Sequence, residues 1–446
     1  MKSTTIQSKS ENQSRHQHSS VRKQVLVSLA ILSFLALGTT FAILYARGYR
    51  FVFGEGKPAV SKTGILNVTS TPKSAQIYID GHLTAATDSS INLTPKKYTV
   101  KVSKDGFNDW QKDVDIEAEV VTSVDPLLFP KSPTLQSIST IGADEALVDP
   151  TGTKLAFKIA SQSARRNGIY IFDMTQRSLP ILQGQSSSTQ LADDTIDRFS
   201  EAKISFSPDG RELLASISAQ VEPLALENPE SEFATDPESE LATYYLLKTN
   251  QLNEAPQDIT ATSQNVLELW QEQRAAKEKS RLKALKPKVA EFYKKYFKVL
   301  AWSPDEKKIL YQASESAEMP VFLNPRRIGN NLRYERRDLQ KDAVYVYNIT
   351  EDLNTRIIGS TEDICLEIDQ DCTVTFTWFP DSAHLVYINN RKIHIVEDDG
   401  ANMTTIYAGP FLGHYVFPWP DGSRIVILTN LGNPNVSPTL YTIGLK

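Results

Sequence analysis

The pattern of hydrophobic and polar positions divides the chain into three regions. The first 24 residues are polar, and a stretch without any charged residue follows at Val25–Ala46. A polar stretch of this kind buries too little apolar surface to fold, so we predict a disordered tail over residues 1–24. From Thr63 onward, apolar and polar residues alternate in many short runs, which is typical of β-strands with one buried face. The pattern therefore predicts a mainly β protein behind one apolar helix.

The apolar stretch is long enough to cross a membrane. As a helix its 22 residues span about 33 Å, close to the thickness of a bilayer core. A cleaved signal peptide is the alternative, but its apolar region is normally shorter and ends at a small-residue cleavage site, which "ARGYRF" does not supply. We predict an uncleaved transmembrane helix at residues 25–46, which makes the membrane itself one partner.

The charges on either side of this helix predict its orientation. Five Lys and Arg residues precede the span, and three follow it closely. The positive-inside rule then places the N-terminus in the cytoplasm and the rest of the chain outside the cell membrane. We therefore expect a single-pass membrane protein with extracytoplasmic domains, joined to the helix by a linker over residues 47–62.

Residues 63–129 have the pattern of a small all-β domain. Ala75, Ile77 and Ile79 alternate with polar neighbours, as in a strand with one buried face. Asp80-Gly81 then gives a strong turn signal, because Gly tolerates positive φ and Asp bonds to its own backbone. No helical stretch interrupts this region.

The same region resembles the PEGA domain. The residues that carry the resemblance are Ser70, Pro72, Ala75, Tyr78, Ile79, Asp80, Gly81, Tyr98, Val100, Val102, Gly106, Phe107 and Trp110. Lys73 and Ser74 replace the Glu and Gly of the name motif, and Lys97 replaces a usual Gly. The resemblance implies a small β-sandwich-like module of envelope and surface proteins that carries no catalytic residue. Nearly every matching residue is also one that a strand or a turn requires for folding alone.

A Ser-Pro-Asp-like turn between two apolar runs recurs five times in the remaining chain. The copies align on Pro150, Pro208, Pro304, Pro380 and Pro420. In each copy we expect one strand before the proline, a tight turn, and a second strand after it. A third strand and, in most copies, a weaker fourth strand follow. Four antiparallel strands repeated in this way predict a β-propeller over residues 130–446.

The residue pattern of the repeat resembles that of the TolB-type propeller, a relative of the WD repeats. The five copies of the repeat predict five blades, with six as the alternative. The last copy has no fourth strand of its own, whereas Thr134–Thr140 forms a strand without a partner. We predict that this segment completes the last blade beside Leu440–Leu445, so that no sheet edge is left open.

A helical insertion interrupts the repeat at about residues 265–298. Its second part carries one apolar stripe, in which the residues are spaced as on a single helix face. This stripe consists of Val289, Phe292, Tyr293, Tyr296 and Phe297. It either packs on the propeller or forms a docking surface for a partner or the membrane.

Candidate chemistry is sparse. The chain has no nucleophile elbow and no phosphate-binding glycine loop. His384, His394 and His414 lack metal-ligand spacing, so we predict no metal and no cofactor. The aspartates of the repeated motif, Asp209, Asp305, Asp381 and Asp421, are expected to cap turns. With 48 Lys and Arg against 53 Asp and Glu, the charge balance also argues against nucleic acid as a partner.

Cys365 and Cys372 are the only cysteines, and six residues separate them. They form a candidate disulfide in an oxidising exterior and stay open in a reducing compartment. Without catalytic residues, the sequence favours a non-catalytic, membrane-tethered binding or scaffold protein with the propeller as recognition head. The two resemblances imply that it belongs to the bacterial envelope. Its partner is an envelope protein or cell-wall glycan. The alternatives are a structural protein that binds cell-wall glycan and a propeller hydrolase whose site is built from loops.

Overall fold

The structure is a computed structural model of the whole chain. It describes residues 11–46, 50–54, 57–139, 142–175, 188–218, 242–325, 334–361, 374–413 and 415–446. These residues fall into two compact units. The first contains the residues up to Val100 together with Asp113–Pro126, and the second contains Lys101–Lys112 and the residues from Leu127 onward. Within the described residues, the regular structure consists of three α-helices, short β-strands and brief 3₁₀ turns.

The first helix, α1, runs from Glu11 to Ala46 and contains one apolar segment of membrane-spanning length. That segment is Val25–Ile43, with 19 residues, a mean hydropathy of 2.2 and exposed apolar side chains. The helix begins well before the predicted span, so the chain from Glu11 on is helical where we predicted a disordered tail. Residues 11–24 contain neither proline nor glycine, and nothing in them ends a helix that the apolar segment nucleates.

The predicted linker over residues 47–62 contains a hairpin. Its strands are β1 (Arg50–Gly54) and β2 (Lys57–Ser61), which pair in antiparallel register from Arg50–Ser61 to Gly54–Lys57. The β-branched and aromatic residues of "RFVF" favour a strand, and this local preference was not used in the prediction.

The next strands form two small sheets. The three-stranded sheet has the order β6-β3-β9, with β3 and β9 parallel, and the four-stranded sheet has the order β5-β4-β7-β8. Ala75, Ile77 and Ile79 are buried, as the alternation predicted. The strands are β3 (Gly64–Val68), β4 (Gln76–Ile79), β5 (His82–Ala86), β6 (Ser89–Leu93), β7 (Lys97–Ser103), β8 (Trp110–Asp115) and β9 (Val121–Val124).

Five further four-stranded antiparallel sheets follow, and we number them in chain order. Sheet 1 consists of β11 (Ala146–Val148), β12 (Lys154–Ile159), β13 (Gly168–Asp173) and β14 (Ser188–Asp193). Sheet 2 consists of β15 (Lys203–Phe206), β16 (Glu212–Ser218), β17 (Ala242–Lys248) and β18 (Gln257–Asp258). Sheet 3 consists of β19 (Phe297–Trp302), β20 (Lys308–Ala313), β23 (Ala343–Asn348) and β24 (Leu353–Ser360). Sheet 4 consists of β25 (Thr375–Trp378), β26 (His384–Asn389), β27 (Lys392–Glu397) and β28 (Thr404–Tyr407).

Sheet 5 joins strands from the two ends of this region. It has the order β29-β30-β31-β10, with β29 (Val416–Pro418), β30 (Arg424–Thr429), β31 (Thr439–Gly444) and β10 (Leu135–Ser137). Gln136 pairs with Thr442 in antiparallel register. This confirms the prediction that the segment near Thr134 completes the last sheet.

Shared hydrophobic cores connect neighbouring sheets. Separate clusters of buried side chains join sheet 1 to sheet 2, sheet 3 to sheet 4, sheet 4 to sheet 5, and sheet 5 to sheet 1. In the cluster between sheets 5 and 1, for example, Trp419 packs edge-on against Phe172, with ring centroids 5.6 Å apart. These four pairs of sheets therefore pack against each other.

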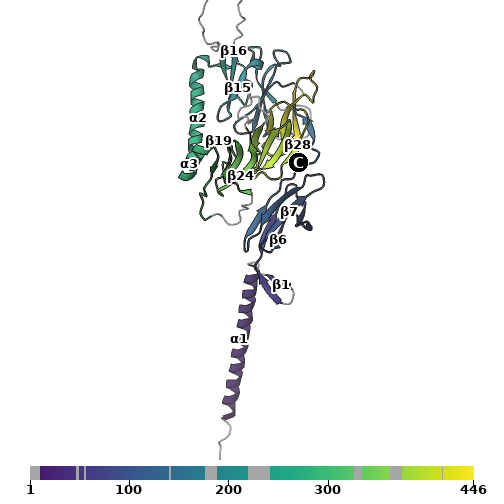
Figure 1. Cartoon of the computed structure of the whole chain (residues 1–446), viewed down its shortest axis with the longest axis vertical. Helices are drawn as coiled ribbons and strands as arrows, with labels where there is room; N and C mark the ends of the chain where they lie inside the picture. Colours follow the sequence, from purple (N-terminus) through teal and green to yellow (C-terminus); the bar gives the residue numbers. More distant parts are fainter. Residues whose placement is uncertain are drawn as a thin grey trace, which may run out of the picture. The chain divides into compact units, whose positions relative to one another are not determined.

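Two helices contact sheets 2 and 3. They are α2 (Ser263–Ala284) and α3 (Pro287–Tyr296), and they lie beside β15, β16 and β19 (Figure 1). Trp270 of α2 packs on Leu214 of sheet 2, whereas Leu285 and α3 pack on sheet 3. The remaining short elements are 3₁₀ turns at Phe199–Glu201 (η2) and Thr260–Thr262 (η3), and a pair of strands, β21 (Ala317–Glu318) and β22 (Asp338–Leu339).

Candidate functional site

One turn geometry recurs in all five sheets. In each copy the residue before the motif proline donates its backbone N–H to the carbonyl of the residue four positions after that proline, at 2.9 Å. The residue two positions after the proline has positive φ in every copy: Gly152, Gly210, Glu306, Ser382 and Gly422. The five turns are therefore superimposable local structures, and their side chains can be compared position by position.

The aspartates of the motif cap these turns. Asp209 accepts the backbone N–H of Arg211 at 3.1 Å, and Asp381 accepts that of Ala383 at 2.8 Å. Asp305 and Asp421 accept the equivalent N–H groups of Lys307 and Ser423. The predicted capping role is confirmed. In keeping with it, hydrogen bonds from Ser207 and from the turn backbone outweigh burial and hold the pKa of Asp209 below its usual value.

The residue four positions after the proline begins the second strand of each sheet. It is Lys154, Glu212, Lys308, His384 or Arg424. Two of these residues reach the turn of the next sheet. Lys154 Nζ donates to the Gly210 carbonyl at 3.1 Å, and Lys308 Nζ donates to the Ser382 carbonyl at 2.8 Å. Since Gly210 and Ser382 occupy the same turn position, the two lysines make equivalent hydrogen bonds. We call the contact region between sheets 1 and 2 junction 1–2, and the one between sheets 3 and 4 junction 3–4.

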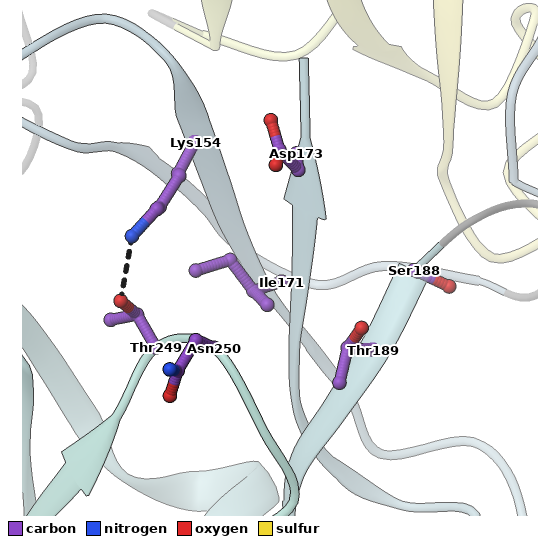
Figure 2. A pocket seen from close by; sticks show the side chains of 7 residues that line it. All are labelled: Lys154, Ile171, Asp173, Ser188, Thr189, Thr249 and Asn250. Atoms are coloured by element: carbon purple, nitrogen blue, oxygen red, sulfur yellow. Dashed lines mark hydrogen bonds between the residues drawn. The ribbon is translucent and has the colours of Figure 1, made fainter. Parts of the chain in front are cut away.

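A pocket of about 370 Å³ opens at junction 1–2. Figure 2 shows that Ile171 and Asp173 come from one strand and Ser188 and Thr189 from its neighbour, while Thr249 and Asn250 lie on the turn of sheet 2. Lys154 Nζ donates to Thr249 Oγ1 at 2.8 Å (Figure 2). Among the described residues, Lys154 forms no ion pair with a carboxylate, and its ammonium group donates to a carbonyl oxygen and a hydroxyl oxygen.

Junction 3–4 repeats this pocket with different side chains. The strand register makes Asn348 the equivalent of Asp173, because each pairs directly with the lysine. By the same register Asp398 and Asp399 are the equivalents of Thr249 and Asn250. The pocket at this junction has a volume of about 170 Å³, and Tyr334, Glu351 and Thr355 also line it.

At junction 3–4 the lysine has an anionic partner. Lys308 Nζ lies 2.5 Å from Asp398 Oδ2, and the two side chains are 16% and 25% exposed. A second lysine, Lys112, which belongs to the same compact unit, contacts Asp399 and lies 2.6 Å from Glu397 Oε2. Two lysines thus meet three carboxylates here.

Burial and charge shift several pKa values in this cluster. Burial alone would lower the pKa of Lys112, but the carboxylates of Glu397 and Asp399 outweigh it and raise that pKa. Burial raises the pKa of Asp398 and of Asp399. For Glu397, burial is outweighed by Lys112, and its pKa is lowered.

His384 lies at the edge of this cluster. Its Nδ1 lies 2.7 Å from Asp381 Oδ2, and its ring packs edge-on against Phe129. Burial would lower the pKa of His384, but the hydrogen bond to Asp381 and the nearby carboxylates raise it. The cluster therefore favours the protonated ring.

The structure assigns the predicted apolar stripe to the protein's own core. Val289, Tyr293 and Phe297 are buried, and Phe292 and Tyr296 pack partly buried in the same cluster on sheet 3. Phe297 is the first residue of β19 rather than part of the helix. Because these side chains contact β20 and β23, the stripe is not exposed for a partner or a membrane, and the alternative of packing on the chain's own sheet is correct.

The other candidate residues are placed as follows. Cys365 and Cys372 lie outside the described residues, as does His414. His394 Nδ1 lies 2.9 Å from Thr405 Oγ1. In the part of the chain that the structure describes, no group of three or more His, Cys, Asp and Glu residues is arranged to hold a metal ion.

Sequence reasoning missed Lys154, Lys308 and Lys112. The first two had a signal, because both stand four positions after a motif proline. Lys112 had none, since it and its partner Glu397 are 285 residues apart in the chain.

Comparison with known proteins identifies one domain. Residues 63–131 match the family model of the PEGA domain, so this part of the chain is a PEGA domain. It ends two residues later than the predicted boundary at 129. No curated protein sequence matches the chain significantly.

Several solved structures share weak similarity with the chain. A TolB protein, described as putative, from Agrobacterium tumefaciens is 14% identical, with 66% of this chain and 76% of that chain covered and a TM-score of 0.20. TolB from Acinetobacter baumannii is 12% identical, with 78% of this chain and 60% of that chain covered and a TM-score of 0.21. An acylaminoacyl peptidase from Pyrococcus horikoshii is 10% identical, with 86% of this chain covered and a TM-score of 0.18. Only 46% of that enzyme is covered, so the chain spans less than half of its length. Similarity at this level carries no argument about activity.

Proposed function

We propose that this chain is a non-catalytic, membrane-tethered binding or scaffold protein of the bacterial cell envelope. Residues 25–46 form an uncleaved anchor with the N-terminus in the cytoplasm. The PEGA domain forms a stalk, and sheets 1–5 form a five-bladed β-propeller that is the recognition head. Its partner is an envelope protein.

The observation that carries the proposal is the set of hydrophobic cores shared by sheets 1 and 2, 3 and 4, 4 and 5, and 5 and 1. Sheet 5 packs on sheet 1 and contains β10, the strand that precedes sheet 1 in the chain. Between sheets 2 and 3, α2 and α3 supply apolar side chains to both neighbours. A ring in which the first strand completes the last sheet leaves no open edge, which is the way that propellers are closed.

The chemistry of the junctions supports binding rather than catalysis. Their polar side chains bond to backbone carbonyls and turn hydroxyls of the neighbouring sheet, as Lys154 does with Gly210 and Thr249. Such side chains hold loops in fixed positions, and fixed loops on a rigid scaffold are the usual location of a recognition surface.

Two experiments test the proposal. A protease added to intact cells should degrade the chain beyond residue 46, and a C-terminal tag that stays intact would contradict the orientation. The detergent-solubilised full chain should capture a specific protein from envelope extract. Capture of purified cell-wall glycan instead would favour a wall-binding structural protein, and turnover of a substrate by the purified chain would refute the non-catalytic assignment.

A further inference from the structure

We propose that the pocket at junction 1–2 binds a small acidic ligand, whose carboxylate or phosphate group contacts Lys154 at the position next to Thr249. The inference rests on the proposed function only in treating the chain as a binding protein. It assigns a ligand class and a residue to one pocket, neither of which follows from the fold alone.

The first argument is the internal comparison between the two junctions. Lys308 and Lys154 make the same hydrogen bond to the next turn, to Ser382 and Gly210. The second partner of Lys308 is the carboxylate of Asp398 at 2.5 Å. At the equivalent place Lys154 meets the neutral hydroxyl of Thr249. Lys308 is therefore in direct contact with a carboxylate, whereas Lys154 is not.

The second argument is the space beside the lysine. The pocket of about 370 Å³ at junction 1–2 is larger than the one of about 170 Å³ at junction 3–4. Pockets that hold small molecules begin at about 300 Å³. Beside Lys154, where no carboxylate of the chain contacts the ammonium group, the pocket therefore has room for an acidic group of a ligand.

The third argument is the donors that face this space. A lysine ammonium has three N–H donors, and Lys154 uses two of them on Gly210 and Thr249. The Asn250 amide and the Thr189 hydroxyl also line the pocket (Figure 2). An ammonium, an amide and a hydroxyl together form a donor set for a carboxylate or a phosphate.

Asp173 narrows the ligand class further. It lines the same pocket, and its Oδ1 accepts the backbone N–H of Thr175 at 2.9 Å and the Thr175 hydroxyl at 2.6 Å. A carboxylate in the lining can accept a hydrogen bond from a hydroxyl on the ligand. The pocket thus fits an acid that also carries a hydroxyl group, such as a sugar acid or a glycerol phosphate.

The test is calorimetric titration of the purified full chain in detergent. The acidic probes are glucuronate and glycerol 3-phosphate, and glucose and glycerol are their uncharged counterparts. We expect one acidic ligand per chain, with binding that weakens as salt is raised, and binding of the uncharged probes at least tenfold weaker. Binding of glucuronate alone assigns a carboxylate, and binding of glycerol 3-phosphate alone assigns a phosphate.

Two variants and one matched control locate the site. Thr249→Asp places in junction 1–2 the carboxylate that junction 3–4 has, and it should weaken acid binding at least tenfold without loss of thermal stability. Lys154→Met should weaken binding to a similar extent. Arg211→Ala is the control, because it removes a nearby cation that does not line the pocket and whose side chain is 84% exposed. It should leave the affinity for the acidic probes within twofold of the wild-type value.

The outcomes separate this inference from the proposed function. No binding of either acidic probe, or equal binding by Thr249→Asp and wild type, would overturn the inference while envelope capture by the same preparation still supports the proposed function. Conversion of a bound probe to product would contradict the proposed function and leave the site in place.

Discussion

Junctions 1–2 and 3–4 share the same local backbone structure, but their lysines have different partners: a hydroxyl at junction 1–2 and a carboxylate at junction 3–4. Both have the same turn, the same strand register and a lysine that reaches the next turn. At junction 3–4 the chain supplies Asp398, Asp399 and Glu397, and a second lysine contacts the last two. At junction 1–2 it supplies a hydroxyl and an amide beside a larger pocket. The comparison shows that the repeat determines the position of the lysine at each junction. The residues at single equivalent positions, such as Thr249 and Asp398, determine whether that lysine contacts a carboxylate of the chain.

Lys112→Met should have the largest effect, because it leaves Glu397 and Asp399 without their shared cation. Their side chains are only 10% and 16% exposed. Removing one partner of a buried ion pair costs about 3–5 kcal/mol of unfolding free energy. Urea denaturation of the detergent-solubilised chain measures this loss. A loss below about 1 kcal/mol would mean that junction 3–4 does not depend on the ion pairs described here.

Lys308→Met and Lys154→Met test the comparison directly. Lys308→Met should cost about 2–3 kcal/mol, because Asp398 stays behind with only a quarter of its side chain exposed. Lys154→Met removes hydrogen bonds to neutral acceptors and should cost about 1 kcal/mol. Unfolding of both variants under the same conditions gives the difference, and equal losses would contradict the distinction between the junctions.

Asp398→Thr converts junction 3–4 to the chemistry of junction 1–2. It removes the buried carboxylate together with the cost of its burial, and Lys308 keeps the Ser382 carbonyl. The expected cost is about 1 kcal/mol, smaller than for Lys308→Met. Asp398→Asn serves as the control of nearly equal volume. If Asp398→Thr destabilises the chain more than Lys308→Met does, the carboxylate has a structural role beyond its ion pair.

The pH dependence of stability should come from junction 3–4. The pKa of His384 is raised in the folded state, so its contribution to stability is complete below about pH 6.5, the unfolded value, and is lost as pH rises through the folded value. The thermal midpoint should therefore fall as pH rises above 6.5. His384→Gln should flatten this slope. A slope that persists in the variant would place the titrating group elsewhere.

Asp209→Ala should have the smallest effect. The aspartate side chain is 57% exposed, and its bonds to Ser207 and Arg211 stay within one turn. Surface changes of this kind usually alter stability by about 0.5 kcal/mol. Thermal unfolding measures the change, and acid binding at junction 1–2 should be unaltered. A large loss of that binding would give the motif aspartate a role beyond the turn.

The sequence predicted the strands and turns better than the contacts between them. The repeated motif predicts each turn because its proline, aspartate and glycine act locally, and the pairing of β10 with β31 followed from counting strands per copy. The extent of α1 and the hairpin of β1 and β2 were missed, because a polar composition alone says little about helix ends. Lys112 and Glu397 could not be paired in advance, since their contact exists only once distant segments are folded together.

The pairing of β10 with β31 also sets an order in time during protein synthesis. Gln136 and Thr442 are 306 residues apart. A ribosome that adds about 5–20 residues per second needs about 15–60 s to make the chain between them. Throughout this interval β10 has no partner strand, and sheet 5 cannot be completed. Its three residues, Leu135, Gln136 and Ser137, include only one apolar side chain. A strand so short and polar offers little to other nascent chains, which suits a segment that must stay unpaired until translation of β31 is finished.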